Sequence, residues 1–161
     1  MPKPSQPPTR GRDAVQSIAR NKRARFDYEI LEQWEAGIVL TGTEVKSLRA
    51  GRATINEAWG VVKDGAIWLL NAHVPPYEQG NQFNHDPVRT RKLLLHRREV
   101  RRLIGAVERQ GLTLVPLELY FKGSHAKVRL ALARGKQVHD KRESIRRREG
   151  DREIARALKT R

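Results

Sequence analysis

The chain has 161 residues, a formal net charge of +15 and a sequence pI of about 11.0. This length fits one domain with appendages, and the absence of cysteine excludes disulfide frameworks, thiolate zinc sites and thiol nucleophiles. No apolar run is long enough for a membrane span or a signal peptide, so the sequence predicts a cytoplasmic protein with no membrane partner.

The positive charge is concentrated at the two ends of the sequence. Residues 1–25 carry seven basic and one acidic side chain, and residues 136–161 carry ten and five. The segment between them, 26–135, carries sixteen basic and twelve acidic side chains. This distribution favours a nucleic-acid partner, because each phosphate that a cation neutralises releases counterions.

Residues 1–17 are rich in proline and basic residues, which predicts a disordered basic arm. The basic segment that follows, 18–25, either extends this arm or forms an element that holds an RNA backbone. In the second interpretation Asn21, Lys22 and Arg23 reach phosphate and sugar groups.

An alternating pattern predicts the first strand. Apolar Phe26, Tyr28, Ile30 and Trp34 are separated by polar residues, as in a half-buried strand. Gly37 interrupts the pattern and predicts a bulge or a barrel corner.

A short helix is predicted after Thr41, because Thr41 and Glu44 have the spacing of a capping box. In this helix Val45 and Leu48 face inward. Gly51 is expected to end it.

Two strands, 53–62 and 66–73, are predicted around a tight hairpin turn at 63–65. The segment 77–92 is long and polar, and loops of this length in compact domains are usually functional or disordered. It ends in an Arg-Thr-Arg-Lys run at 89–92. We expect this run to be dispensable to the fold and well placed to meet phosphates.

A longer helix is predicted from the apolar stripe of Val100, Leu103, Ile104 and Val107, and Gly111 ends it. Four arginines between positions 97 and 102 occupy much of the remaining helix surface. That surface is either a solvated face or an RNA contact.

Two more strands, 112–121 and 125–134, close the domain, and a phase change at Pro116 indicates a bulge or an edge position. The predicted fold class is mostly β with α. It is a small OB-like antiparallel barrel of about six strands over residues 18–135, with a short capped helix and one longer flanking helix.

A basic C-terminal tail, 136–161, follows the barrel. Ile154 and Leu158 share a helix face, but Ile145 lies opposite, so no stripe is wide enough to dock on a core. The tail is either a disordered solubilising segment or a helix that orders on a polyanion.

The sequence contains no recognisable catalytic motif. Phosphate-binding loop, dinucleotide-binding and zinc-protease motifs are missing, and no two histidines have metal-ligand spacing. The pairs His85-Asp86 and His139-Asp140 are weak signals for a metal hydrolase, because neighbouring side chains usually point apart. We therefore expect no enzyme, no cofactor and no metal site, and an RNA hydrolase or modifying enzyme is a minor alternative.

Four stretches follow one another along most of the chain. They are NKRARFDY with the later EAG, GTEVKSLRAGRATI, DPVRTRKLLLHRRE and ARGKQVHDKR. In this order and at this spacing they resemble the SmpB family, the SsrA-binding proteins that partner transfer-messenger RNA (tmRNA) in bacterial ribosome rescue.

The resemblance implies an OB-like barrel that binds the tRNA-like domain of tmRNA and has no catalytic activity. It implies delivery of this RNA, with elongation factor Tu bound through the tmRNA complex, to ribosomes stalled on non-stop mRNA. The tail would reach the decoding centre of the small subunit and enter the empty mRNA channel as a helix. We expect a monomer. A generic RNA-binding or ribosome-assembly module, whose tail merely adds affinity, is the alternative.

The resemblance also implies site residues. Those for tmRNA binding are Asn21, Lys22, Arg23, Glu35, Arg89, Thr90, Arg91, Lys92 and Leu94. Those of the ribosome-binding tail are Lys136, His139, Asp140, Lys141 and Arg142. By itself Glu35 reads as an exposed strand carboxylate, but a carboxylate can accept hydrogen bonds from base amino groups. Gly150 stands where the family often has a bulky aromatic, and glycine costs a helix about 1 kcal/mol relative to alanine.

Overall fold

The computed structural model describes residues 14–80, 84–136 and 138–159. Within these ranges the chain forms seven strands and four helices. In chain order they are β1 (Val15–Arg20), α1 (Ala24–Asp27), β2 (Tyr28–Ile38), α2 (Gly42–Arg49), β3 (Trp59–Lys63), β4 (Ala66–Leu70), β5 (Arg91–Leu94), α3 (Arg97–Gln110), β6 (Thr113–Lys122), β7 (His125–Gly135) and α4 (Val138–Lys159).

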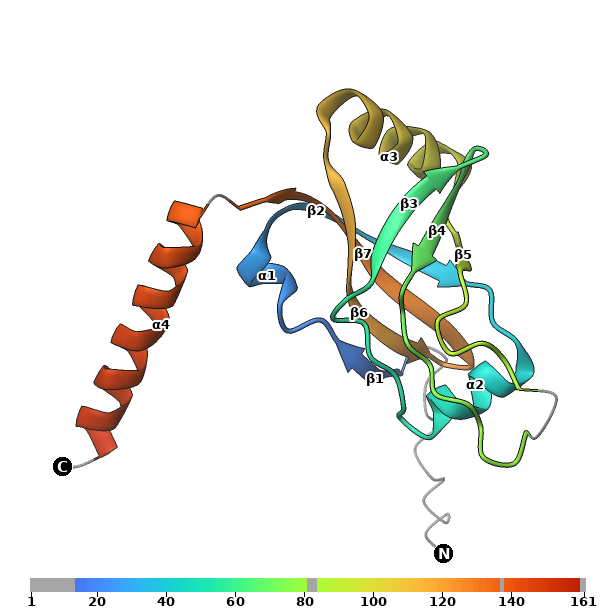
Figure 1. The fold of residues 1–161 in the computed structure, drawn as a ribbon, viewed down its shortest axis with the longest axis horizontal. Coiled ribbons are helices and arrows are strands. Elements are labelled where there is room, and N and C mark those ends of the chain that lie inside the picture. Colours follow the sequence, from blue (N-terminus) through green and yellow to red (C-terminus); the bar gives the residue numbers. More distant parts are fainter. Residues whose placement is uncertain (1–13, 81–83, 137, 160–161) are drawn as a thin grey trace, which may run out of the picture.

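Six of these strands close into a barrel (Figure 1). Neighbours in the sheet run β6-β3-β4-β5-β2-β7, every pairing is antiparallel, and β7 pairs again with β6 to complete the ring. The seventh strand, β1, pairs with β6 outside this ring. The predicted fold class, a small antiparallel OB-like barrel with flanking helices, is confirmed.

Two strands are not predicted by the local pattern. β5 is only four residues long and ends a cationic run, so it reads as loop. β1 has three exposed residues at its start and shows no clean alternation. It includes residues 15–17, which the sequence assigns to the basic arm. Residues 1–13 of that arm lie outside the described part of the structure.

The barrel has a main core inside and a small apolar cluster outside, and β7 contributes to both. Leu130 and Leu132 face the main core, whereas Ala131 and Ala133 pack with Ala24 of α1 in the outer cluster. All five side chains are 5% exposed or less. This outer cluster is what fixes α1, and with it the basic segment before α1, to the barrel wall.

Bulges change which face each strand presents. The phase change predicted near Pro116 is confirmed as a bulge between Pro116 and Glu118 of β6. In β2 the bulge falls at Leu31, not at Gly37 as predicted. Gly37 lies in regular pairing, where an added Cβ would stand 3.3 Å from the Cβ of Leu94, so close strand approach explains this glycine.

The predicted helix and turn signals are confirmed where they are local. Thr41 and Glu44 form the capping box of α2, and Gly51 follows this helix at φ 75°. The turn between β3 and β4 has positive φ at both Asp64 and Gly65, as a two-residue hairpin of type I′ requires. The predicted element boundaries agree less well with the structure. Phe26 belongs to α1 and not to the first predicted strand, and of the strand predicted at 53–62 only the part from Trp59 onward is β3.

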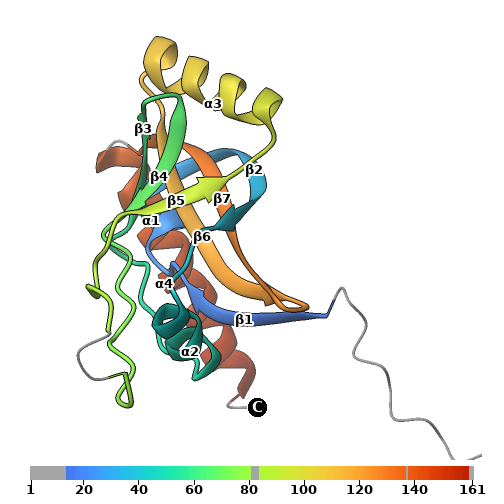
Figure 2. The ribbon, with the colours of Figure 1, turned by 90° about the vertical axis from the view of Figure 1, so that its right-hand side faces the viewer.

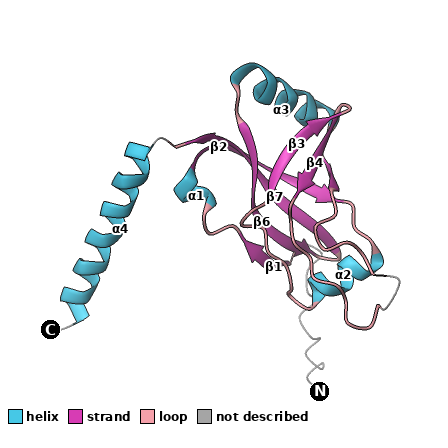
Figure 3. Cartoon of the chain, in the orientation of Figure 1, coloured by secondary structure: helices cyan, strands magenta, loops and turns pink. Residues whose placement is uncertain are grey.

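The tail forms helix α4, which projects from the barrel (Figures 1 and 3). The helix passes through Gly150 without a break, so the weak point expected there does not divide it. It contacts α1 through a cation–π pair, in which the Arg148 guanidinium lies 5.4 Å from the centre of the Phe26 ring. Among the described residues, no helix combines the length and the apolar character that crossing a bilayer requires.

Candidate nucleic-acid interface

The outer face of the barrel brings together residues that are distant in sequence. In β5 alternate side chains are exposed, namely Lys92 and Leu94. Gly37 of β2 pairs with Leu94 on one side and with Lys127 of β7 on the other. Since side chains at paired positions share a face of the sheet, Leu94 and Lys127 lie on the face that also carries Glu35, two residues before Gly37.

Glu35 is held on this face by side chains of β6. The Tyr120 hydroxyl donates to Glu35 Oε2 at 2.5 Å, and Lys122 Nζ lies 3.3 Å from Glu35 Oε1. The hydrogen bond from Tyr120 is the main reason that the pKa of Glu35 lies below its ordinary value. Burial acts in the opposite direction but is weaker than this hydrogen bond, and Lys122 and Lys127 lower the pKa further. Burial and the contact with Glu35 raise the pKa of Tyr120. At neutral pH Glu35 is therefore a fixed, ionised acceptor.

Three cations, Lys122, Lys127 and Arg129, lie beside this carboxylate, and Lys92 lies farther along the same outer face. We call the set the Glu35 surface, and it consists of Glu35, Lys92, Leu94, Lys122, Lys127 and Arg129. The last three are not among the site residues predicted from the sequence. The alternation of residues 125–134 does place Lys127 and Arg129 on the outward face of their strand. Only the pairing register of β2 with β7, which no local pattern reveals, places them beside Glu35.

Replacing Tyr120 by phenylalanine is expected to raise the pKa of Glu35 toward its ordinary value, because the largest lowering influence is removed. Carbon-detected NMR titration of the Glu35 carboxyl measures the change. Tyr77→Phe is the matched control, since the Tyr77 hydroxyl donates to Gln79 instead. An unchanged Glu35 titration in Tyr120→Phe would show that the hydrogen bond does not form in solution.

A buried ionic cluster lies between α2 and β5. The side chains of Glu44 and Arg91 are both 0% exposed, and they form an ion pair. Arg89 Nη2 lies 2.6 Å from Glu44 Oε1, and the Thr41 amide donates to the same oxygen at 2.8 Å. The carboxylate of Glu44 thus accepts hydrogen bonds from two guanidinium groups and one backbone amide.

Arg91 is a structural residue, and the expectation that its run is dispensable to the fold is wrong. Its Nη1 donates to the carbonyl of Ala72 at 2.7 Å and its Nη2 to the carbonyl of Pro87 at 3.3 Å. Inside the protein, the guanidinium therefore links α2 to two points of the loop between β4 and β5, Ala72 and Pro87. In this structure it is not exposed to meet a phosphate.

The other members of the run differ in exposure. Thr90 and Lys92 are exposed, and the side chain of Arg89 is 33% exposed while it bonds Glu44 and the carbonyl of Val39. The sequence misleads here because four polar residues in a row look solvated. The partner that buries Arg91, Glu44, is 47 residues away in the chain.

Asn21 is also buried, whereas its neighbours Lys22 and Arg23 are exposed. Asn21 Nδ2 donates to the carbonyl of Pro116 at 2.9 Å, and its Oδ1 accepts from the amides of Arg23 and Ala24 at 3.3 and 3.1 Å. Contrary to the prediction, this amide does not reach outward. It fixes the start of α1 to β6 and so positions the two cations.

Two ion pairs connect the segment before α1 with the Glu35 surface. Glu118 lies 3.8 Å from Arg20 Nε and 3.2 Å from Arg129 Nη1. Arg129 also lies over the ring of Tyr120, 5.6 Å from its centre. The basic segment and the Glu35 surface are therefore joined through β6 rather than separate.

The root of the tail is tied to α1. The Lys136 amide donates to the carbonyl of Asp27 and its Nζ to the carbonyl of Arg25, both at 2.9 Å. Of the other predicted tail residues, Arg142 is exposed on α4. The side chains of three more lie outside the described part of the structure: His139, Asp140 and Lys141.

Comparison with known proteins is consistent with this geometry. A family model described as SmpB protein matches residues 18–160. The chain belongs to the SmpB family. The resemblance seen in the four sequence stretches is thereby confirmed.

SmpB relatives match along most of this chain. An SsrA-binding protein of Gloeothece citriformis is 58% identical over 143 residues, covering 88% of this chain and 92% of the relative. One of Acidothermus cellulolyticus is 60% identical over 141 residues, covering 88% and 89%. A solved structure described as "tmRNA-SmpB: a journey to the center of the bacterial ribosome" matches with a TM-score of 0.64 and 54% identity, over 80% of this chain and 94% of that one.

In this SmpB fold the first His-Asp pair has separate hydrogen bonds. His85 Nε2 lies 2.8 Å from the carbonyl of Val74, which can only accept, so Nε2 carries a hydrogen. Nδ1 is hydrogen-bonded to the Thr43 hydroxyl at 2.8 Å, and in the neutral ring it is the acceptor. Asp86 accepts from the amide of Val88 at 3.0 Å. In the described part of the chain, no three or more His, Asp or Glu side chains gather as they would around a metal ion.

Proposed function

We propose that this chain binds the tRNA-like domain of tmRNA and delivers it to ribosomes stalled on non-stop mRNA, the process called trans-translation. The observation that carries the proposal is the similarity to SsrA-binding proteins along nearly the whole chain. The chain acts as a binding factor in the cytoplasm, without a cofactor and without a catalytic step of its own.

The Glu35 surface is the part of the barrel that suits tmRNA best. Its lysines and Arg129 supply cations for phosphates, which contribute affinity, and Glu35 supplies a fixed acceptor for the amino groups of bases. Exposed Thr90, Lys22 and Arg23 extend the contact. Buried Asn21 and Arg91 do not contact the RNA and instead position the exposed residues. Arg89, which is partly exposed and bonded to Glu44, both contacts the RNA and positions its neighbours.

The tail has a different role in this proposal. Anchored at Lys136, it enters the empty mRNA channel as a helix, with His139, Asp140, Lys141 and Arg142 near the decoding centre of the small subunit. Elongation factor Tu joins through the tmRNA complex, and one copy of the chain binds one RNA as a monomer.

Replacing Lys127 by alanine is expected to weaken binding of the tRNA-like domain and to lower the slope of log affinity against log salt by about 1, the effect of removing one phosphate contact. Filter binding or fluorescence anisotropy at several salt concentrations measures both quantities. Lys63→Ala is the control, because Lys63 is an exposed cation at the β3–β4 turn, outside the Glu35 surface. It should leave the slope unchanged.

The same assay tests the proposed function as a whole. The chain should bind the tRNA-like domain much more tightly than an unrelated RNA hairpin of equal length. Equal affinity for the two RNAs would refute the proposal and would favour a generic RNA-binding module.

A further inference from the structure

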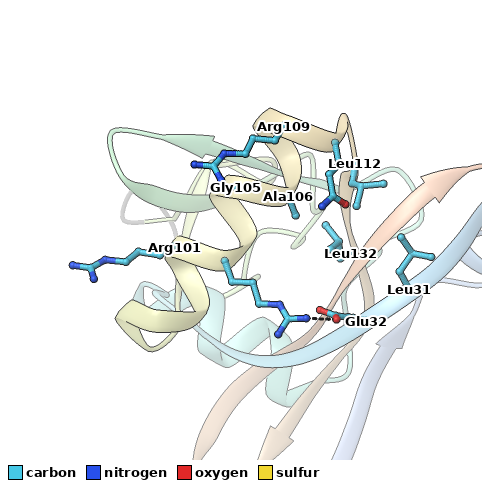
Figure 4. A pocket seen from close by; sticks show the side chains of 10 residues that line it. Leu31, Glu32, Arg101, Gly105, Ala106, Arg109, Leu112 and Leu132 are labelled. Atoms are coloured by element: carbon cyan, nitrogen blue, oxygen red, sulfur yellow. Dashed lines mark hydrogen bonds and ion pairs between the residues drawn. The ribbon is translucent and has the colours of Figure 1, made fainter.

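The structure contains a groove that the proposed function does not use. It lies between α3 and the bulged part of β2 (Figure 4). Helix α3 stands at the opposite end of the barrel from α2 (Figure 2). The volume of the groove is about 490 Å³, within the range of sites that hold small ligands. The bulge in β2 exposes Leu31 on one wall, and buried Leu112 and Leu132 form an apolar floor.

The wall formed by α3 has an unusual residue at its centre. Gly105 lies inside the helix, where glycine is less favourable than alanine. As at Gly150 of α4, neither a positive φ nor a close approach of another chain segment explains this glycine. Its φ is not positive, and an added Cβ would meet no atom within 4 Å, whereas at Gly60 it would stand 2.7 Å from the Cβ of Leu114. What Gly105 provides is open space beside the helix backbone, as a closely approaching ligand requires.

The rim of the groove is cationic. Arg102 of α3 forms an ion pair with Glu32 of β2. Arg101 and Arg109, on the same helix, are exposed, and their side chains extend away from the leucine floor toward solvent (Figure 4). Neither Arg101 nor Arg109 has an ion-pair partner in the described part of the chain. Three guanidinium groups against one carboxylate favour an anionic ligand, and the apolar floor favours a ligand with a flat apolar part.

We propose that this groove holds one unstacked nucleotide of an RNA strand. The base lies over the leucine floor beside Gly105, Gln110 offers an amide to its edge, and Arg101 and Arg109 contact the flanking phosphates. Bases that leave a stack are recognised in this way, by apolar or guanidinium contacts and by hydrogen bonds to their edges. The inference rests on the proposed function, which brings the chain to two RNAs, tmRNA and ribosomal RNA.

Two variants test the groove in the full-length chain. Gly105→Leu fills it without changing charge and with a better helix former, and Arg109→Ala removes one rim cation. Each is expected to lower affinity for one of two probes, the tRNA-like domain or isolated small ribosomal subunits. Gly105→Leu should lower it about tenfold, the size of one lost base contact, and Arg109→Ala should lower it through one lost phosphate contact. The probe that loses affinity identifies the source of the nucleotide. Arg98→Ala, also on α3 but not lining the groove, is the matched charge control and should have a smaller effect.

The outcomes separate this inference from the proposed function. The proposed function stands if the wild-type chain discriminates the tRNA-like domain from a hairpin. The nucleotide site is refuted if a Gly105→Leu variant melts no lower than wild type and still binds both probes as tightly as wild type does. An acidic protein segment as the true occupant would give this result. Equal losses in Arg98→Ala and Arg109→Ala, with none in Gly105→Leu, would also refute it, because they would show a diffuse cationic face.

Discussion

Replacing Glu44 by glutamine is expected to destabilise the fold by about 3–5 kcal/mol, because it leaves the guanidinium of Arg91 buried without its countercharge. Desolvation of an unpaired ion is much more costly than the loss of the same pair at the surface. Arg91 cannot escape to water, since its other nitrogens are held by the carbonyls of Ala72 and Pro87. Urea unfolding followed by tryptophan fluorescence measures the effect.

A matched control is available on the surface. Glu78→Gln removes an exposed carboxylate that lies 3.2 Å from Arg52, and exposed pairs contribute only about 0–1 kcal/mol. Replacing the whole buried pair, with Glu44→Leu and Arg91→Met together, should recover much of the lost stability, because apolar side chains leave no unpaired charge. Similar small losses for Glu44→Gln and Glu78→Gln would contradict the buried cluster.

The same cluster sets a pH dependence. Burial acts to raise the pKa of Glu44, but hydrogen bonds from Arg89, the Thr41 amide and Arg91 outweigh it and hold the pKa below the ordinary value of 4.5. The stabilisation is therefore fully present above pH 4.5 and is lost as the pH falls through the lower pKa of the folded state. In Glu44→Gln this part of the acid transition should be absent.

The contrast between Glu44 and Arg91 shows what local sequence can predict. The capping box of Thr41 and Glu44 is encoded within four residues, so the start of α2 is correctly predicted. The same carboxylate also neutralises Arg91, and that contact depends on how distant strands pair. A run of cations after a long polar loop looks solvated, and only the closed barrel turns one of them inward.

Some residues of the candidate site can likewise be found from the sequence, and others only from the structure. The resemblance leads to Glu35, Lys92 and Leu94, and in the structure these three lie on one outer face. It does not lead to Lys122 or Lys127, because nothing in the sequence fixes the register between β2, β6 and β7. Strand pairing is set by packing over the whole sheet, so residues added by register appear only in three dimensions.

In the proposed function, the tail and the Glu35 surface are two binding modules on one chain. They are joined at Lys136, whose amide and Nζ bind the carbonyls of Asp27 and Arg25. The tail emerges beside α1 and projects away from the barrel (Figure 1). The proposed function accordingly gives α4 a second partner while the barrel holds RNA. A linked second contact can raise overall affinity by about 10²–10⁴ without changing the first one.

Ending the chain after Lys136 is therefore expected to abolish peptide tagging on stalled ribosomes while tmRNA binding survives. Retaining Lys136 keeps the hydrogen bonds to α1, so the barrel should unfold at the same urea concentration as the full chain. Affinity for the tRNA-like domain should fall less than about tenfold, as expected for loss of a modest excess of positive charge. Tagging, which needs both modules, should fall by about 10² or more in a reconstituted translation assay on non-stop mRNA.

A charge variant of the full-length chain tests two tail cations while the rest of the tail stays in place. Lys141→Ala with Arg142→Ala keeps the length of α4 and should impair tagging far more than affinity for tmRNA. If truncation instead removes tmRNA binding, or if the double variant lowers both activities equally, the tail contributes to RNA affinity and not to a separate ribosomal contact. The division of roles between barrel and tail would then be wrong, and the tmRNA contact of the Glu35 surface would rest on the Lys127→Ala test in the full-length chain.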